Sequence, residues 1–214
     1  NANASAKQYG NIELESVTVL QFIFSHMEIV MQPKDTLNPL QIDAKNSRWT
    51  ETLKDGSEVN IRPIRKEDTL AEVAFIDALS PESRRFRFLG QMRHPSEKMI
   101  EQLTNIDYQH DVAFVAEAKQ NDVEIFVGVS RYSVSNDGTE CECAVTVLDN
   151  WQGKGLASIL MKHLIDVARS RGIKRMWSID AAANQPRLEL ANFLGFKHHI
   201  DPDDSSLVIF SLSL

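Results

Sequence analysis

The chain has 214 residues, 43% of them hydrophobic, and carries a formal net charge of −7 at pH 7. This length and apolar content are sufficient for one globular domain with a full core and an additional segment. The modest charge, mixed in sign, argues against general binding to nucleic acid or to an anionic membrane, but it allows a local basic pocket for phosphate groups.

Residues 1–48 differ in pattern from the rest of the chain, and we assign them to an N-terminal extension that precedes a single domain at residues 49–214. The apolar run at residues 17–24 is too short to span a membrane, and the acidic residues before it do not fit a signal peptide. We expect part of the extension to be cloning-derived or to lie upstream of a natural start at Met27 or Met31.

After the extension, strand and helix signals follow one another. An Asp-Gly turn at residues 55–56 predicts a hairpin before a strand at residues 58–64. Asp68 can cap a helix whose apolar residues recur at helical spacing. Ser80 and Pro95 mark the beginnings of two further helices.

The predicted helix that begins at Ser80 contains a cluster of three arginines and two aromatic residues, namely Arg84, Arg85, Phe86, Arg87 and Phe88. Such a cluster can bind an anion. We favour a solvated face with the two rings packed beneath it, because long basic side chains commonly cover apolar surface in this way.

A meander of three strands is predicted at residues 112–118, 124–134 and 140–148, with polar turns between them. Cys141 and Cys143 alternate with glutamates on the third strand, so both thiols point to one face and cannot form a disulfide with each other. No second Cys/His pair stands at zinc-finger spacing, so we favour buried thiols over a metal site.

A glycine-rich segment at residues 152–158 joins the third strand to a long amphipathic helix. The first amides of a helix lack backbone partners and lie at its positive end, so they can bind a pyrophosphate. Gly153 and Gly155 leave room for this approach, and Ala157 keeps the first turn slim. The spacing does not fit a nucleotide triphosphatase loop or a dinucleotide-binding fold, which leaves a plain turn as the alternative.

The remaining pattern predicts a strand at residues 174–180, a helix at residues 184–194 and a final antiparallel pair at residues 197–200 and 207–212. Together with the meander, this order predicts a mixed α/β sheet with helices on both faces.

The spacing Gln152-x-x-Gly155-x-Ala157 resembles the Gln/Arg-x-x-Gly-x-Gly/Ala motif of the GNAT superfamily of N-acetyltransferases. Residues 184–196 are similar to the later helix of that superfamily, which contains an asparagine and closes on Leu-Gly-Phe. The order of these motifs makes the resemblance more specific than either motif alone.

Upstream, residues 61–68 and 79–88 resemble the acetyltransferase domain of bacterial Pat-type protein lysine acetyltransferases, and the likeness extends over residues 49–214. The resemblance implies an α/β fold with a mixed, mostly antiparallel central sheet flanked by helices on both faces. It also implies that acetyl-CoA is the co-substrate of an acetyl transfer to an amine.

The resemblance further implies roles for single residues. Glu142, ten residues before Gln152, matches the glutamate that several family members use as a general base; Glu140 is the reserve candidate, and a solvated strand residue is the alternative. Asn184 matches an asparagine that contacts the cofactor, and it can also cap a helix. The residues expected to bind acetyl-CoA are Val145, Val147, Gln152, Gly153, Lys154, Gly155, Leu156, Ala157, Ser158 and Asn184.

One position departs from the family pattern. Many members carry a tyrosine four residues before the glycine of Gly195-Phe196, where it protonates the departing thiolate, and here Ala191 occupies that position. The sequence therefore does not identify a general acid.

The leading hypothesis is an acetyl-CoA-dependent N-acetyltransferase that modifies a protein lysine in the cytoplasm. The alternatives are an enzyme that acetylates a small amine, such as a polyamine or an antibiotic, and a non-catalytic module that senses acetyl-CoA. The expected partners are acetyl-CoA and the amine acceptor, without nucleic acid, membrane or metal, and a homodimer is left open.

Overall fold

The computed structural model describes residues 42–90, 92 and 94–214. The predictions for residues 17–24 and for a start at Met27 or Met31 lie outside the described residues. Among the described helices, none combines the length and apolar character that crossing a membrane requires.

An eight-stranded sheet forms the centre of the domain, in the strand order β1-β2-β3-β4-β5-β6-β8-β7. Neighbouring strands are antiparallel except for β5 and β6, which are parallel. The strands are β1 (Trp49–Thr52), β2 (Glu58–Pro63), β3 (Asp111–Gln120), β4 (Val123–Val134), β5 (Glu140–Val147), β6 (Arg175–Ala181), β7 (Lys197–Ile200) and β8 (Leu207–Ser213).

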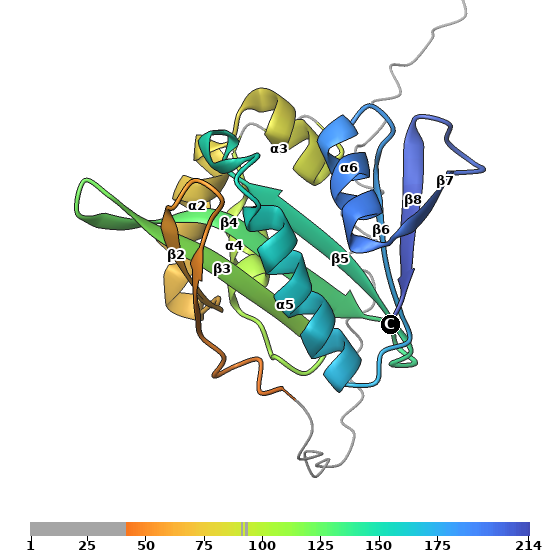
Figure 1. The fold of residues 1–214 in the computed structure, drawn as a ribbon, viewed down its shortest axis with the longest axis horizontal. Coiled ribbons are helices and arrows are strands. Elements are labelled where there is room, and N and C mark those ends of the chain that lie inside the picture. Colours follow the sequence, from red (N-terminus) through yellow and green to blue (C-terminus); the bar gives the residue numbers. More distant parts are fainter. Residues whose placement is uncertain (1–41, 91, 93) are drawn as a thin grey trace, which may run out of the picture.

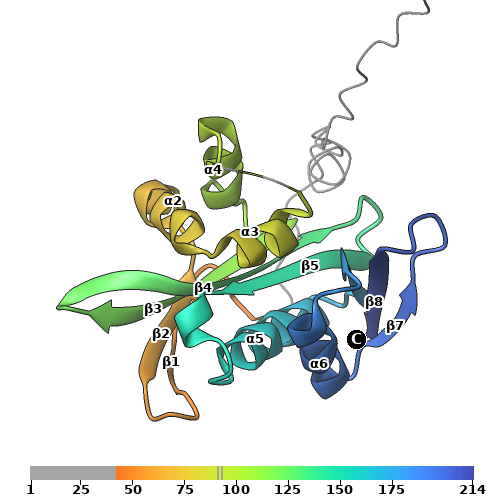
Figure 2. The same cartoon turned by 90° about the horizontal axis from the view of Figure 1, so that it is seen from above.

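Helices cover both faces of this sheet (Figure 1). Figure 2 shows three helices on one face, α2 (Thr69–Ala78), α3 (Pro81–Phe88) and α4 (Glu97–Thr104), and two on the other, α5 (Leu156–Ser170) and α6 (Gln185–Leu194). Short 3₁₀ turns, η1 (Lys66–Asp68) and η2 (Asp149–Trp151), precede α2 and α5. The structure therefore confirms the fold class predicted from the sequence, and the predicted elements are present with small shifts at their ends.

Close packing of α5 on β4 fixes the position of the helix that follows the glycine-rich segment. A Cβ atom at Gly128 of β4 would lie 2.9 Å from Cδ1 of Leu160 and 3.2 Å from Cδ2 of Leu156, so a side chain there would push α5 away. Both leucines are fully buried. The first turn of α5 is thus anchored against the middle of the sheet.

Local signals explain most of the element boundaries. Ser80 caps α3 by accepting a hydrogen bond from the Ser83 amide at 3.1 Å, and Ser96 caps α4 in the same way. The β3–β4 turn places Asn121 and Asp122 at φ of +52° and +63°, a conformation that these residue types tolerate best after glycine.

Asp68 occupies the N-cap position of α2, but its side chain makes no capping hydrogen bond to that helix. The capping role predicted for this side chain is therefore wrong. Its carboxylate instead binds the guanidinium of Arg62 at 2.7 Å and accepts a hydrogen bond from the Arg65 amide. A bidentate bond to arginine is stronger than a neutral cap bond, so the carboxylate turns toward the sheet.

Cys141 and Cys143 are free and buried, as their place on the strand indicates. Burial raises the pKa of the Cys143 thiol to about 11, so it stays protonated near neutral pH. In the part of the chain that the structure describes, no cluster of three or more His, Cys, Asp or Glu side chains is arranged to hold a metal ion.

Candidate active site

The segment between β5 and α5 forms a tight loop with exposed backbone donors. Gly153 and Gly155 have φ of +73° and +93°, a region in which glycine is unstrained. Within the described residues, the amides of residues 153–158 donate no hydrogen bond to the protein. Since these amides lie at the positive end of a 15-residue helix, their position is suited to binding an anion.

The β1–β2 hairpin holds this loop from one side. The Lys54 amide donates to the Lys154 carbonyl at 3.1 Å, and the Lys154 ammonium lies 3.0 Å from the Asp55 carboxylate and above the Trp151 ring. Gly155 packs against the aliphatic part of Lys54. The side chain of Lys154, a predicted binding residue, is therefore turned toward the hairpin, where it forms an ion pair with Asp55.

Helix α3 holds the loop from the other side. The Asp149 carboxylate accepts hydrogen bonds from the Ser80 amide and from the hydroxyls of Ser80 and Ser83 at 2.7–3.0 Å. The Gln152 side chain donates to the Val147 carbonyl at 3.1 Å and approaches the Ser83 hydroxyl at 3.4 Å. These bonds fix the direction in which the loop leaves β5.

The two parallel strands β5 and β6 separate on the way to this loop. They pair at only three positions, from Glu140 opposite Arg175 to Glu142 opposite Trp177. Beyond these pairs β5 continues to Val147, and among the described residues no strand pairs with it on that side. The opening therefore widens from Glu142 toward the glycine-rich loop.

The backbone of β5 presents hydrogen-bonding groups to this opening. The Leu148 amide donates to the Val127 carbonyl of β4, and backbone groups along a strand alternate between its two edges. Val145 and Val147 therefore direct their backbone amides and carbonyls away from β4, into the opening. An extended chain that contains amide groups can pair with them as a neighbouring strand would.

Glu142 lies at the narrow end of the opening. It stands opposite Ser133 of β4 and shares a face of the sheet with Arg131, which binds the Glu72 carboxylate of α2 at 3.2 Å. Its side chain thus points to the α2–α4 face. Burial raises the pKa of Glu142, and the nearby Arg87 partly offsets that effect.

The reserve candidate Glu140 has a different environment. Its carboxylate binds the Arg175 guanidinium, with Nε at 2.7 Å, and this hydrogen bond lowers the pKa of Glu140. A half-buried carboxylate with a raised pKa is the better proton acceptor near neutral pH, so the geometry favours Glu142 over Glu140.

Arg87 corrects the interpretation of the arginine cluster in α3. Burial and the repulsion of Arg131 lower the pKa of Arg87 to about 10, while the carboxylates of Glu72, Glu142 and Asp180 oppose that shift. A solvated face is therefore wrong for Arg87. Arg87 is only partly exposed, since α3 packs on β5, where the Glu142 carboxylate lies.

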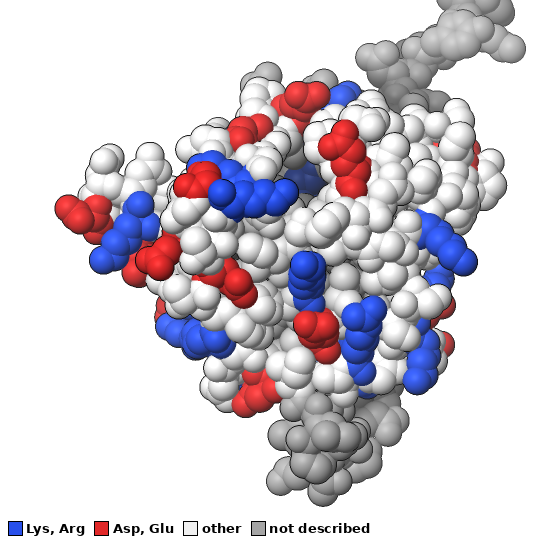
Figure 3. All heavy atoms as spheres, in the orientation of Figure 1, with Lys and Arg blue, Asp and Glu red and all other residues white. Residues whose placement is uncertain are grey.

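A surface view agrees with this placement. Figure 3 shows a hollow in the region of α3, α6 and the first turn of α5, with lysine or arginine atoms on its floor.

Asn184 and Ala191 lie on the α6 side of the site. Asn184 caps α6 by accepting from the Arg187 amide at 3.2 Å, and its side-chain nitrogen donates to Asp180 at 3.0 Å. Its alternative role as an N-cap is thus present. Ala191 is fully buried and bonds through its carbonyl to the Phe196 amide, so this position offers no acidic group.

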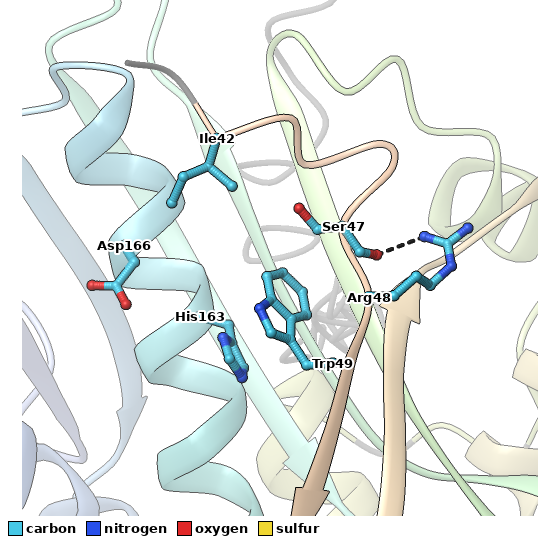
Figure 4. Close-up of a pocket in the computed structure, with 6 residues that line it drawn as sticks. All are labelled: Ile42, Ser47, Arg48, Trp49, His163 and Asp166. Carbon is cyan, nitrogen blue, oxygen red and sulfur yellow. Dashed lines mark hydrogen bonds between the residues drawn. The ribbon is translucent and has the colours of Figure 1, made fainter. Parts of the chain in front are cut away.

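A shallow pocket of about 340 Å³ lies elsewhere, between β1 and the middle of α5 (Figure 4). His163 stacks on Trp49 with ring centroids 4.1 Å apart and bonds to Glu51 at 2.7 Å, so it borders the core. The pocket has neither free helix amides nor separated strands. It is lined by Ile42, Ser47, Arg48, Trp49, His163 and Asp166.

The loop and Glu142 were predicted from the sequence, whereas Arg87, which lies near Glu142, was not. Nor was the buried Arg187, which donates to the Ser178 hydroxyl at 2.7 Å and lies near the Phe196 and Phe210 rings. Charged residues at inward helical positions are the signal that could have found both.

A strand opening, free helix amides and a half-buried carboxylate are the features that a transferase needs to act on an acyl carrier with a phosphate-containing tail. Comparisons with known proteins agree with this class. Residues 76–196 match the model of the acetyltransferase (GNAT) family. An acetyltransferase of Pseudomonas aeruginosa is 47% identical over 170 residues, which are 79% of this chain and 91% of that protein.

Other relatives cover different shares of the chain. Streptothricin acetyltransferase of Streptomyces lavendulae is 34% identical over 83 residues, 39% of this chain and 43% of that protein. Among solved structures, the GNAT domain of S. lividans PAT has a TM-score of 0.71 and 27% identity, over 78% of this chain and 97% of that one. A cAMP-binding acyltransferase from Mycobacterium smegmatis, at a TM-score of 0.53 and 22% identity, shares the fold over 78% of this chain and 47% of its own.

The chain belongs to the GNAT family of acetyltransferases. It is an N-acetyltransferase, and its co-substrate is acetyl-CoA.

Proposed function

We propose that this enzyme acetylates lysine side chains of proteins, with acetyl-CoA held between the glycine-rich loop and the separated strands and with Glu142 as the general base. The observation that carries the proposal is the opening between β5 and β6, which begins at Glu142 and ends at the loop of free amides.

The residues around the opening fit acetyl-CoA. The amides of residues 153–158 bind the pyrophosphate, and the left-handed φ of Gly155 holds them in place. The backbone groups of Val145 and the amide of Val147 bind the pantetheine amides, since the Val147 carbonyl already accepts a hydrogen bond from Gln152. Acetyl-CoA supplies a thioester whose acetyl group is already activated for transfer. Leu156, Ala157 and Ser158 contribute the first helical turn, and Asn184 borders the opposite side.

The proposed chemistry at the narrow end rests on Glu142. Glu142 accepts a proton from the lysine ammonium, because only the neutral amine has a lone pair that can attack the thioester carbonyl. The new C–N bond replaces the C–S bond, and the sulfur leaves as a thiolate. The nitrogen loses a second proton as the amide forms, and because Ala191 cannot protonate the thiolate, we propose that a water molecule carries that proton to the sulfur.

The choice of a protein lysine rests on two likenesses. Residues 61–68 and 79–88 resemble Pat-type domains, and the chain matches 97% of the GNAT domain of S. lividans PAT. A protein acceptor and acetyl-CoA are both available in the cytoplasm, where we expect the enzyme to act. One observation favours a small amine instead, namely the 34% identity to streptothricin acetyltransferase, and it covers only 39% of the chain.

A kinetic comparison tests the acceptor. We expect kcat/KM for a folded protein, with an acyl-CoA synthetase as the test acceptor, to exceed the values for spermidine, streptothricin and free lysine. If a small amine is preferred by more than about tenfold, or about 1.4 kcal/mol of transition-state free energy, the protein-acceptor proposal is wrong.

A pH profile tests the pairing of Arg87 with Glu142. Removing a neighbouring cation disfavours the ionised carboxylate, so Arg87→Met should raise the pKa of Glu142 and move the acid limb of kcat/KM to higher pH. Activity should then fall several-fold more at pH 6 than at pH 8.

The other charges near this pair are unchanged in the variant, namely Glu72 of α2, Arg131 of β4 and Asp180 of β6. Arg87→Lys keeps a cation and should keep the wild-type profile. An equal loss of activity at every pH in Arg87→Met would mean that Arg87 only supports the packing of α3.

A further inference from the structure

An exposed aromatic side chain stands beside a lysine on the surface formed by α5 and α6. Phe193 of α6 is 67% exposed, which is unusual for a side chain of this size. The Lys162 ammonium of α5 lies 5.6 Å from the centroid of the Phe193 ring. Neither Phe193 nor Lys162 has a role in the proposed acetyl transfer.

Lys162 lies one helical turn beyond Ser158, the last residue of the proposed pyrophosphate site. At 1.5 Å per residue, its Cα is about 10 Å from that of Gly155 along the helix axis. Side chains of a helix lean toward its N-terminus, so the Lys162 side chain can extend back over the turn that contains Ser158. The proposed phosphate position is therefore within its reach.

The charge of Lys162 is available to an added anion. Within the described part of the chain no carboxylate lies at salt-bridge distance from it, and the contact it makes is with the Phe193 ring. Asp166, one turn further along α5, is 3.9 Å from Arg169 instead. Glu189 of α6 is exposed and forms no ion pair within that part of the chain.

We propose that Phe193 and Lys162 bind the adenosine end of coenzyme A, with the ring of Phe193 stacked on the adenine and the Lys162 ammonium paired with the 3′-phosphate. The proposal rests on the proposed function, because it places the pyrophosphate at the amides of residues 153–158. Only the ribose separates the pyrophosphate from both the base and the 3′-phosphate. The exposed ring of Phe193 suits the adenine base, and the ammonium of Lys162 suits the 3′-phosphate.

Calorimetric titration of the full chain with three ligands distinguishes the 3′-phosphate contact from the adenine contact. The ligands are coenzyme A, 3′-dephospho-coenzyme A and 4′-phosphopantetheine. For Lys162→Met, we expect the Kd for coenzyme A to rise about tenfold and the Kd for the dephospho form to change less than about twofold. For Phe193→Ala, we expect a rise of about tenfold with both nucleotide ligands and no change with phosphopantetheine.

Lys98→Met provides a matched control, because Lys98 is an exposed lysine of α4 on the opposite face of the sheet. It should leave all three affinities unchanged. Because Lys162 and Phe193 are exposed, their variants should keep the wild-type thermal unfolding midpoint within about 2 °C.

Two results would overturn the inference while leaving acetyl-CoA binding intact: an unchanged Kd for coenzyme A in both variants, or an equal loss with coenzyme A and its dephospho form in Lys162→Met. An effect of Phe193→Ala on protein acceptor kinetics alone would assign the ring to the acceptor and also overturn it. Failure of the wild-type protein to bind coenzyme A would instead contradict the proposed function itself.

Discussion

Gly155→Val should raise the Kd for coenzyme A by at least about a hundredfold, to a level at which calorimetry detects no binding. Gly155 has φ of +93°, which a β-branched residue adopts only with strain. A Cβ atom there would lie in ordinary contact, 3.5 Å from the Lys54 side chain, so the cost of the substitution lies in the backbone conformation. The loop must therefore change its path, and the amides that follow would no longer converge on one anion.

A second glycine provides the control for strain alone. Gly138, in the turn between β4 and β5, has φ of +72° and open space around it. Gly138→Val should destabilise the fold by a similar amount, about 1–3 kcal/mol, without changing the affinity for coenzyme A. If both variants bind coenzyme A equally well, the loop is a plain turn and the proposed pyrophosphate site is wrong.

Glu142→Gln should lower kcat by about 10²–10⁴-fold and leave the Kd for acetyl-CoA within about twofold, because the amide cannot accept the lysine proton. The shape of the side chain is retained, and among the described residues none forms a hydrogen bond or ion pair with the Glu142 carboxylate. Single-turnover kinetics with a saturating acceptor measures this loss directly.

Glu140→Gln is the comparison variant on the same strand. It removes the ion pair with Arg175, which is largely exposed and therefore worth about 0–1 kcal/mol, so turnover should change less than about threefold. The reverse result, a large loss in Glu140→Gln and a small one in Glu142→Gln, would show that the base is two residues earlier.

Local sequence signals predicted the features of the site that depend on local geometry. The spacing of Gly153 and Gly155 determines a loop with positive φ and the start of α5, and the alternation around Cys141 and Cys143 places their thiols in the core. Ser80 caps the helix that it was predicted to begin. These features depend on residues close together in the chain.

The features that were missed depend on contacts between distant segments. The separation of β5 from β6 beyond Glu142 follows from the register of a parallel pair joined by α5, and periodicity does not specify that register. Arg87 turns inward because Glu72, Glu142 and Asp180 lie beneath α3, which no pattern within α3 reveals. Asp68 failed as a cap for a similar reason, since Arg62 competes for its carboxylate.

A crystal structure of the protein with bound coenzyme A tests the central claim most directly. The account predicts pyrophosphate oxygens within about 3.2 Å of amides between Gly153 and Ser158, and the pantetheine arm between β5 and β6 with its sulfur directed toward Glu142. Coenzyme A bound outside this opening, for example in the pocket beside Trp49 and His163, would contradict it.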